Sequence, residues 1–252
     1  MIYDIKDLDL DLDLNDGSVV YGFIDNTLDF QLENRTARKE LLEYIPACFN
    51  KKDVYIYEVK QVHGNNIVVL DKNFKIKDAG NYYDLNLAEA DGVFTQKTGI
   101  MLCIRTADCI PVLFYDRIKR VAGAVHCGWR GVYTDIIINA KSILINDFHS
   151  NLDDVIIITG PSICKNCYEV KDDFLNKFIA KNKLNRRFFE RTSEYNKLYF
   201  DLKGLLKNEL NLYGFKKENI YDLNKCNFED KNFYSYRRNK TDKRQVSFIA
   251  IN

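Results

Sequence analysis

The amino-acid sequence predicts an α+β fold in which helices flank mixed β-sheets. Short apolar runs rich in Val, Ile and Phe, bounded by Gly, Asp or Pro, cluster in the first part of the chain, as strands do. Helix-like and strand-like segments alternate in the second part, and this mixture favours the α+β class. The 252 residues contain no internal repeat and no Pro/Gly/Ser-rich linker, so we expect one domain spanning residues 1–252.

The expected strands follow the apolar runs in chain order. Residues 7–14 alternate Asp and Leu, which suits either an edge strand with one apolar face or a solvated acidic arm. Residues 155–159 read Val-Ile-Ile-Ile-Thr and are expected to form a buried strand. The other expected strands are 19–24, 54–62, 66–70, 92–95, 100–104, 111–115, 121–125, 220–223 and 246–251.

Longer segments carry the end signals of helices. The first spans 34–49, with Asn34 as its candidate N-cap, and the last spans 201–213, where Gly214 ends it. Between them, helices are expected at 132–148 and 170–181. Residues 74–88 are polar and irregular, so we expect a loop there.

Composition narrows the class of protein. The chain has 37 basic and 36 acidic residues, a net charge of +1, which points neither to nucleic acid nor to a membrane as the main partner. No run approaches the roughly 18 apolar residues of a membrane span, and residues 1–7 do not resemble a secretory signal. Seven irregularly spaced cysteines indicate a reducing, cytoplasmic compartment rather than a disulfide framework.

Two histidines and one cysteine stand out as candidate metal ligands. The chain has only three histidines, and His63, Cys109 and His126 each lie beside a strand-like run. Side chains at strand ends can converge on one rigid site although they are far apart in sequence. Two imidazoles and a thiolate suit a borderline divalent metal, and three protein ligands leave open the fourth position of a catalytic zinc. His149, at an expected helix end, has no such context and is expected to lie on the surface.

Several short sequence words occur in a fixed order along the chain. They are Gln61-Val62-His63-Gly64, Ala90-Asp91-Gly92, Thr106-Ala107-Asp108-Cys109-Ile110-Pro111, His126-Cys127-Gly128-Trp129-Arg130-Gly131, Gly160-Pro161-Ser162-Ile163, Tyr168-Glu169-Val170 and Ser235-Tyr236-Arg237-Arg238. This set resembles the YfiH-like, laccase-domain (polyphenol oxidase) family of purine nucleoside phosphorylases. The resemblance runs from about Asn34 to the C-terminus and implies a YfiH-like fold, whereas residues 1–33 form a divergent, shortened N-terminal part.

The resemblance also implies a metal and an activity. It implies that His63, Cys109 and His126 bind zinc, with copper as the alternative metal. It implies phosphorolysis of adenosine, inosine or guanosine to the free base and ribose 1-phosphate, together with methylthioadenosine phosphorolysis and adenosine deamination. The implied partners are therefore purine nucleosides and phosphate.

Arginines are the first candidates for holding that phosphate, because the guanidinium group grips it at two points. The candidates are Arg130, Arg237, Arg238 and Arg105, each of which could instead be solvated or salt-bridged. Trp129, the only tryptophan, could stack on a purine or fill the core.

Acidic residues next to these words are candidates for proton transfer. Asp108 directly precedes Cys109, and with Arg130 it is the candidate catalytic residue. It could orient a ligand histidine or act as a general acid or base, and the sequence leaves both roles open. Glu169 is a weaker candidate of the same kind.

Two other functions remain open. A copper-dependent phenol oxidase is one, although three histidines cannot supply several copper sites and only a single His₂Cys copper is conceivable. A non-catalytic zinc-binding accessory protein is the other, and it would turn over no nucleoside. The H-x-E motif of the zinc nucleobase deaminases is absent, so any deamination would have to use a site different from that of those enzymes.

One further motif could indicate a different function or a different metal site. Cys164-Lys165-Asn166-Cys167 is a C-x-x-C pattern, which is found in redox pairs and in halves of zinc knuckles. No second C-x-x-C and no paired histidine follows at zinc-finger spacing. We therefore expect Cys164 and Cys167 not to be essential for activity.

Overall fold

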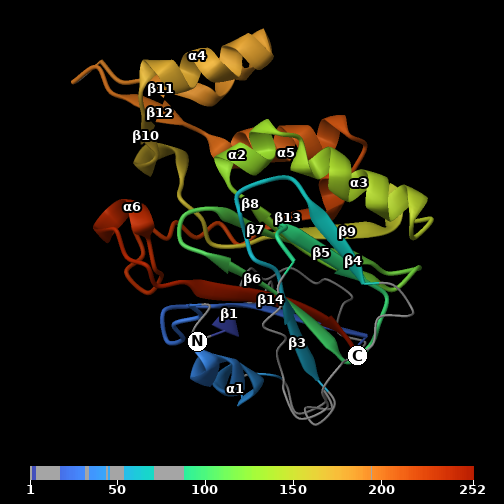
Figure 1. Cartoon of the computed structure of the whole chain (residues 1–252). Coiled ribbons are helices and arrows are strands. Elements are labelled where there is room, and N and C mark those ends of the chain that lie inside the picture. Colours follow the sequence, from blue (N-terminus) through green and yellow to red (C-terminus); the bar gives the residue numbers. More distant parts are fainter. Residues whose placement is uncertain are drawn as a thin grey trace.

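The computed structural model describes residues 2–3, 18–31, 34–43, 45, 54–70, 88–193 and 195–252. The expected arm or strand at 7–14 and all of the expected loop except Ala88 lie outside these ranges. Two large β-sheets stack on each other with helices on their outer faces, and a small sheet projects beyond them (Figure 1). No helix within the described ranges is long and apolar enough to cross a membrane.

A six-stranded sheet forms one of the two stacked layers. Across the sheet, its strands are β13 (Ile220–Asp222), β9 (Val155–Thr159), β7 (Ile110–Asp116), β8 (Val121–Cys127), β5 (Gly92–Thr95) and β4 (Ile67–Leu70). β13 and β4 each run parallel to their neighbour, and the other pairs are antiparallel. β7, β8 and β9 are buried along their whole length, which explains their continuous apolar runs.

A five-stranded sheet forms the second layer. Its strands, in order, are β1 (Ile2–Tyr3), β2 (Val19–Ile24), β14 (Gln245–Ile251), β6 (Ile100–Thr106) and β3 (Tyr55–Glu58). Side chains of β6 alternate between two cores, as strand geometry requires. Leu102 and Ile104 pack between the sheets against Leu113 and Ile156, while Met101 packs toward α1 on the other face.

Helices cover the outer faces of both layers. They are α1 (Arg35–Glu43), α2 (Trp129–Tyr133), α3 (Ile136–Asn146), α4 (Asp172–Lys181), α5 (Leu202–Leu212) and α6 (Tyr236–Asn239), with short 3₁₀ turns η3 (Leu152–Asp154), η4 (Lys165–Cys167), η5 (Lys183–Phe188) and η6 (Lys217–Asn219). Figure 1 shows α2, α3 and α5 together over the six-stranded sheet and α1 against the five-stranded one. The mixed sheets with flanking helices confirm the predicted α+β class.

The prediction of one long helix at 132–148 is wrong, because the structure has two helices there. α2 ends at Tyr133 and α3 begins at Ile136. Asp135 between them has a φ of 65°, in the left-handed region, which an α-helix cannot contain. The apolar pattern continues across this break, so periodicity could not reveal it. The break ends α2 after a single turn, and α2 carries Trp129 and Arg130.

Other helices and strands begin or end at residues different from those predicted. The helix expected at 170–181 begins at Asp172, because residues 169–170 form β10 and pair with β12 (Leu198–Phe200). With β11 (Phe189–Arg191) these strands make a three-stranded sheet that the sequence did not predict. Strands of two or three residues are too short to show a period. The sheet supports an aromatic cluster in which the rings of Phe174, Phe189 and Phe200 pack on one another.

Candidate functional site

The three predicted metal ligands come together. His63 lies in the loop between β3 and β4, Cys109 in the turn between β6 and β7, and His126 near the end of β8. One ligand atom from each lies within 4.8 Å of the others, and the two imidazole rings meet edge to face with centroids 4.8 Å apart. His126 is buried, Cys109 is half-buried and His63 is exposed. The cluster therefore has a buried side and an open side.

Strand pairing explains why ligands from distant segments meet. In the antiparallel β7–β8 pair, Ile110 lies opposite Cys127, so the turn that carries Cys109 sits beside His126. Gly128 allows this approach, since a Cβ atom there would lie 3.0 Å from the Sγ of Cys109 and 3.2 Å from the His63 ring. The glycine after His126-Cys127 is thus part of the site.

Asp91 organises the cluster, a role that the sequence alone does not predict. Its fully buried carboxylate lies 2.7 Å from Nδ1 of His126. It also accepts hydrogen bonds from the backbone amides of Val62, His63 and Gly64, at 3.2, 2.9 and 2.6 Å. One carboxylate therefore orients one ligand ring and fixes the loop that carries the other, in which His63 has a φ of 60°. Asp91 therefore has the orienting role that the sequence leaves open for Asp108.

Cys109 and His126 form a tightly coupled pair. Burial alone raises the pKa of the Cys109 thiol, but His126 and His63 outweigh it and hold that pKa below its ordinary value. Burial alone lowers the pKa of His126, whereas Cys109 and Asp91 raise it above its ordinary value. Burial also opposes ionisation of Asp91, yet hydrogen bonds from His126 and the backbone keep the pKa of its carboxyl low. The surroundings thus favour the thiolate, which is the form that binds metal.

The three candidate ligands line a cavity of about 600 Å³, a volume in the range of small-molecule sites. Its wall is rich in cations and aromatic rings. The cations are Arg105, Arg130, Arg237, Lys240 and Arg244, and the aromatic residues besides the histidines are Trp129, Tyr168 and Tyr236. Asp108 is the one acidic residue among the lining residues that the structure describes. A pocket with this balance suits an anionic ligand that also presents a flat or apolar surface.

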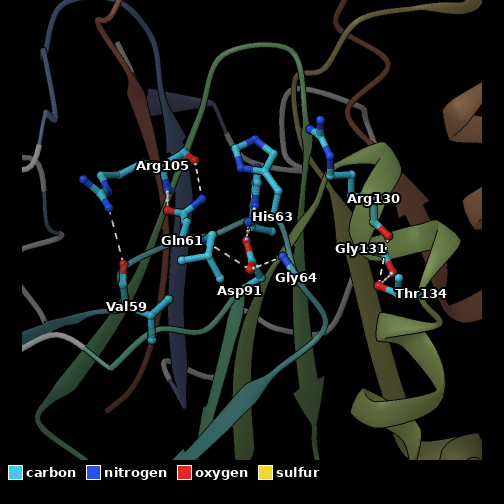
Figure 2. Close-up of polar contacts among 11 residues, drawn as sticks. Val59, Gln61, His63, Gly64, Asp91, Arg105, Arg130, Gly131 and Thr134 are labelled. Carbon is cyan, nitrogen blue, oxygen red and sulfur yellow. Dashed lines mark hydrogen bonds and ion pairs between the residues drawn. The ribbon is translucent and has the colours of Figure 1, made fainter.

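Arg130 and Arg237 present their guanidinium groups at this pocket. Arg130 is exposed, and its guanidinium carbon lies 4.5 Å from the Trp129 ring centroid. Figure 2 shows its side chain extending toward the same open side as the His63 imidazole. Arg237 stacks over Tyr168 at 5.1 Å and donates a hydrogen bond of 2.6 Å to the backbone carbonyl of Glu169. Each guanidinium is placed by an aromatic face.

Arg105 and Arg238 are held by the protein itself. Arg105 lines the pocket, but its guanidinium pairs with Glu58 at 3.4 Å. Gln61 bridges the backbone N–H and C=O of Arg105, which attaches the His63 loop to β6 (Figure 2). Arg238 is not among the lining residues, and its guanidinium donates to backbone carbonyls, including those of Asn227 and Phe233 at 2.7 and 2.6 Å. Its position indicates a structural contribution.

Asp108 lines the pocket beside Cys109 with a strained backbone, at a φ of 95°. One carboxylate oxygen accepts a hydrogen bond of 2.6 Å from the amide of Arg237 at the start of α6. Burial raises the pKa of Asp108, although hydrogen bonds from Ser235 and the Arg237 amide oppose the shift. Asp108 therefore ties the turn of the Cys109 ligand to the helix that carries Arg237.

Of the remaining candidate residues, one lines the pocket and two lie outside it. Trp129 lines the pocket and also packs edge to face on Phe174 at 5.0 Å, so it takes part in both the wall and the core. Glu169 is exposed, pairs with Lys197 at 3.1 Å and does not line the pocket. His149 follows α3 and is exposed, as expected.

Comparison with known proteins places this arrangement in a family. A family model described as multi-copper polyphenol oxidoreductase laccase matches residues 31–252. The chain belongs to this laccase-like YfiH family. The match begins close to Asn34, where the sequence resemblance was expected to start, and it contains every candidate site residue.

Relatives of this laccase-like chain are named for a different activity. It is 31% identical over 212 residues to a protein of Rickettsia conorii named purine nucleoside phosphorylase, covering 81% of this chain and 82% of the relative. It is 32% identical over 213 residues to a protein of Borreliella burgdorferi with the same name, covering 83% of each chain. The fold is similar to that of the Bacillus licheniformis hypothetical protein YfiH, with a TM-score of 0.77, 24% identity and 93% coverage of both chains.

The donor set fits a single borderline divalent ion better than a multicopper centre. Two imidazoles and one thiolate, oriented by Asp91, are suitable ligands for zinc or for one copper. A multicopper centre needs several histidine-rich sites, but the third histidine of this laccase-like chain, His149, lies outside the cluster. The residues present therefore match one metal ion with an open coordination position.

Proposed function

We propose that this protein is a zinc-dependent purine nucleoside phosphorylase acting on adenosine, inosine or guanosine. The observation that carries the proposal is the cation-lined cavity of about 600 Å³ that contains the two histidines and the cysteine. The names of relatives about one-third identical to the chain support the same activity. The proposed partners are nucleosides and phosphate, in a cytoplasmic protein without a nucleic-acid or membrane partner.

Arg130 and Arg237 are the proposed phosphate ligands. A phosphate dianion needs fixed positive charge, and a planar guanidinium offers two parallel hydrogen bonds to it. Their aromatic neighbours Trp129 and Tyr168 hold the two groups at the wall of the cavity. Lys240 adds a further positive charge to the same wall. The tyrosine and tryptophan rings offer flat surfaces on which the nucleoside can pack.

Phosphorolysis needs little covalent chemistry from the protein. A phosphate oxygen attacks C1′ of the ribose as the bond from C1′ to the purine nitrogen breaks, and the purine leaves with the bonding electron pair. A proton delivered to the purine makes it a better leaving group. Asp108 is the proposed acid, because it lines the cavity and burial raises the pKa of its carboxyl.

His63, Cys109 and His126 are the proposed zinc ligands. A bound zinc ion would supply Lewis acidity, which polarises a substrate atom or lowers the pKa of a water molecule. Asp91 keeps the His126 ring and the His63 loop in place for this purpose. Methylthioadenosine phosphorolysis and adenosine deamination are proposed as further activities of the same pocket, on the strength of the family resemblance.

The decisive experiment measures base release from a panel of purine nucleosides, with and without phosphate, alongside metal analysis of the purified chain. We expect release of the base only with phosphate, formation of ribose 1-phosphate, and loss of activity after chelation that zinc restores. Activity on phenols that depends on copper would replace this proposal with the oxidase. Tight zinc binding without turnover of any nucleoside would leave the non-catalytic accessory protein.

A further inference from the structure

A second group of metal-binding side chains lies outside the pocket. Cys164 and Cys167 come from the loop after β9, and Cys226 and Glu229 come from the segment between β13 and α6. One ligand atom from each of the four residues lies within 4.8 Å of the others. None of the four lines the cavity described above. The sequence has no second C-x-x-C and no paired histidine after Cys167, and the structure places Cys226 and Glu229 beside the C-x-x-C pair instead.

The backbone brings the two halves together before any side chain is considered. Ser162 and Cys226 form a parallel bridge, in which the amide of Ser162 donates to the carbonyl of Lys225 at 3.2 Å. The amide of Asn227 then donates to the carbonyl of Ser162 at 3.3 Å. These bonds hold the Cys164 segment directly beside the Cys226 segment.

Each half is a tight turn that places its two donors on one side. The amide of Cys167 donates to the carbonyl of Cys164 at 3.1 Å, and the amide of Asp230 donates to the carbonyl of Cys226 at 2.8 Å. The two turns also contact each other through their donors. The amide of Cys164 donates to Sγ of Cys226 at 3.4 Å, and the thiol of Cys167 donates to the carboxylate of Glu229 at 3.5 Å. The two turns therefore hold their three sulfurs and the carboxylate against one another.

We propose that Cys164, Cys167, Cys226 and Glu229 form a second metal site that holds a structural zinc ion. Structural zinc sites are closed and take four protein ligands, with cysteines paired at C-x-x-C spacing, and carboxylate oxygens are accepted ligands. A disulfide accounts for the arrangement less well, since it would use two of three adjacent sulfurs and would leave the carboxylate without a role. The structure has all three cysteines as free thiols.

The position of this site gives it a mechanical role. Ile163, which precedes Cys164, lines the pocket, and its amide donates to the carbonyl of Asp108 at 3.0 Å. The segment that follows Glu229 leads to Arg237 in α6. A metal that joins the two turns would therefore fasten one wall of the pocket without contacting its contents. The inference concerns stability and metal content, and it holds whether or not the protein is a phosphorylase.

Metal stoichiometry of the purified, untagged chain tests the proposal. We expect two equivalents of zinc in the wild type and one in C109A. The C164S/C167S double variant should also retain one equivalent, and the triple variant should retain none. D230N and C103A are matched controls, because they change a neighbouring carboxylate and a buried thiol outside the cluster, and both should keep two equivalents. At a temperature where it is folded, C164S/C167S should keep phosphorolysis, if the chain has it, within about tenfold of wild type, or about 1.4 kcal/mol of barrier.

Cobalt gives an independent readout that does not require every variant to fold. The chelator-stripped wild type, titrated with Co²⁺, should take up two equivalents, and the thiolate-to-cobalt absorption of one should persist in C109A. E229Q keeps all three sulfurs and should release its second metal to a competing chelator at least about tenfold more readily than D230N, a loss in the range seen when metal sites are weakened. One equivalent of metal in both the wild type and C164S/C167S would overturn the proposal. So would thiol counting that finds a Cys164–Cys167 or Cys164–Cys226 disulfide in protein purified under reducing conditions.

Discussion

The two ligand clusters of this protein differ in donors, exposure and support. The pocket cluster has two imidazoles and one sulfur and lines a cavity of about 600 Å³. The loop cluster, Cys164, Cys167, Cys226 and Glu229, has three sulfurs and a carboxylate and lies outside that cavity. Three ligands beside a cavity leave a coordination position for a substrate, whereas four ligands close the site. On this comparison, the pocket cluster serves the reaction and the loop cluster serves stability.

The supports of the clusters differ as well. Sheet pairing and the buried Asp91 hold the pocket cluster, so its ligands stay in place through contacts that do not need a metal. The loop cluster is held by a backbone bridge and two turns. Loss of metal should therefore affect chemistry at the first cluster and stability at the second.

The largest effect that separates the clusters is expected for C109A. Removing the sulfur leaves two imidazoles, so the pocket should lose its tightly bound zinc while the chain stays folded. Because Lewis acidity is worth several kcal/mol, phosphorolysis should fall on the order of 10³-fold. Zinc analysis, thermal unfolding and base release from inosine, measured on the same preparation, check this. If C109A keeps a full complement of tightly bound zinc, the ligand assignment is wrong.

A smaller effect is expected for D91N, which tests the support rather than the ligand. An amide in place of the carboxylate weakens the bonds to His126 and to the His63 loop, so zinc affinity should fall by about 10- to 100-fold. D116N is the matched control, because Asp116 is also a fully buried carboxylate that accepts two backbone amides, from Ile118 and Lys119. Chelator competition should separate the variants. Equal zinc affinity in both would show that Asp91 is only a folding residue.

The sequence points to the pocket cluster because each of its three candidate ligands lies in a short motif beside a predicted strand. Asp91 lies in such a motif too, but its role depends on how two loops pack, which no local pattern reports. The sequence does not predict the loop cluster, because Cys226 and Glu229 are far from Cys164 along the chain. In addition, these two residues include only one cysteine, so they do not form a C-x-x-C motif. The fold class followed from the apolar runs, while the break at Asp135 and the three-stranded sheet had no periodicity to reveal them.

The next expected effect is on phosphate binding by the pocket arginines. It also shows that adjacent residues in one motif can have different roles, which the sequence does not reveal. Arg237 and Arg238 are neighbours in one word, yet neighbouring residues of a helix point in different directions, and only Arg237 lines the pocket. R130K and R237K keep the charge but lose the planar fork, so the KM for phosphate should rise about tenfold, or about 1.4 kcal/mol. The KM for the nucleoside should change less.

R238K serves as the control for both arginine variants. It breaks bonds to backbone carbonyls such as those of Asn227 and Phe233, so it should lower stability by about 1–3 kcal/mol and spare phosphate affinity. Steady-state kinetics in phosphate and thermal unfolding distinguish the outcomes. Unchanged phosphate kinetics in R130K and R237K would move the anion site to another cation of the cavity wall, with Lys240 as the next candidate.

The last comparison concerns a buried carboxylate that belongs to neither cluster, and its expected effect is on stability rather than on activity. Glu209 in α5 is 9% exposed, and within the described residues its Oε2 has no hydrogen-bond partner. Burial raises the pKa of Glu209 to about 8, with a further rise from Asp135 and an opposing effect from Lys181. Asp91, which is also buried, has a lowered pKa because His126 and backbone amides donate to it. The pair shows that hydrogen-bond partners, not burial alone, decide whether a carboxylate is charged.

The sign of the pH effect follows from that raised pKa. Between the ordinary value of 4.5 and about 8, the folded chain keeps a proton on Glu209 that the unfolded chain has lost. This contribution to stability is complete below the lower pKa and is lost as pH rises through the higher one. The glutamine of E209Q cannot titrate, so from about pH 5 to about pH 8 its stability should fall less than that of the wild type, by on the order of 2 kcal/mol. Unfolding free energies across this range test the difference, with E218Q, at an exposed glutamate, as the control. Parallel curves for E209Q and the wild type would mean that Glu209 is ionised in the folded chain, and that water or a side chain outside the described residues satisfies its Oε2.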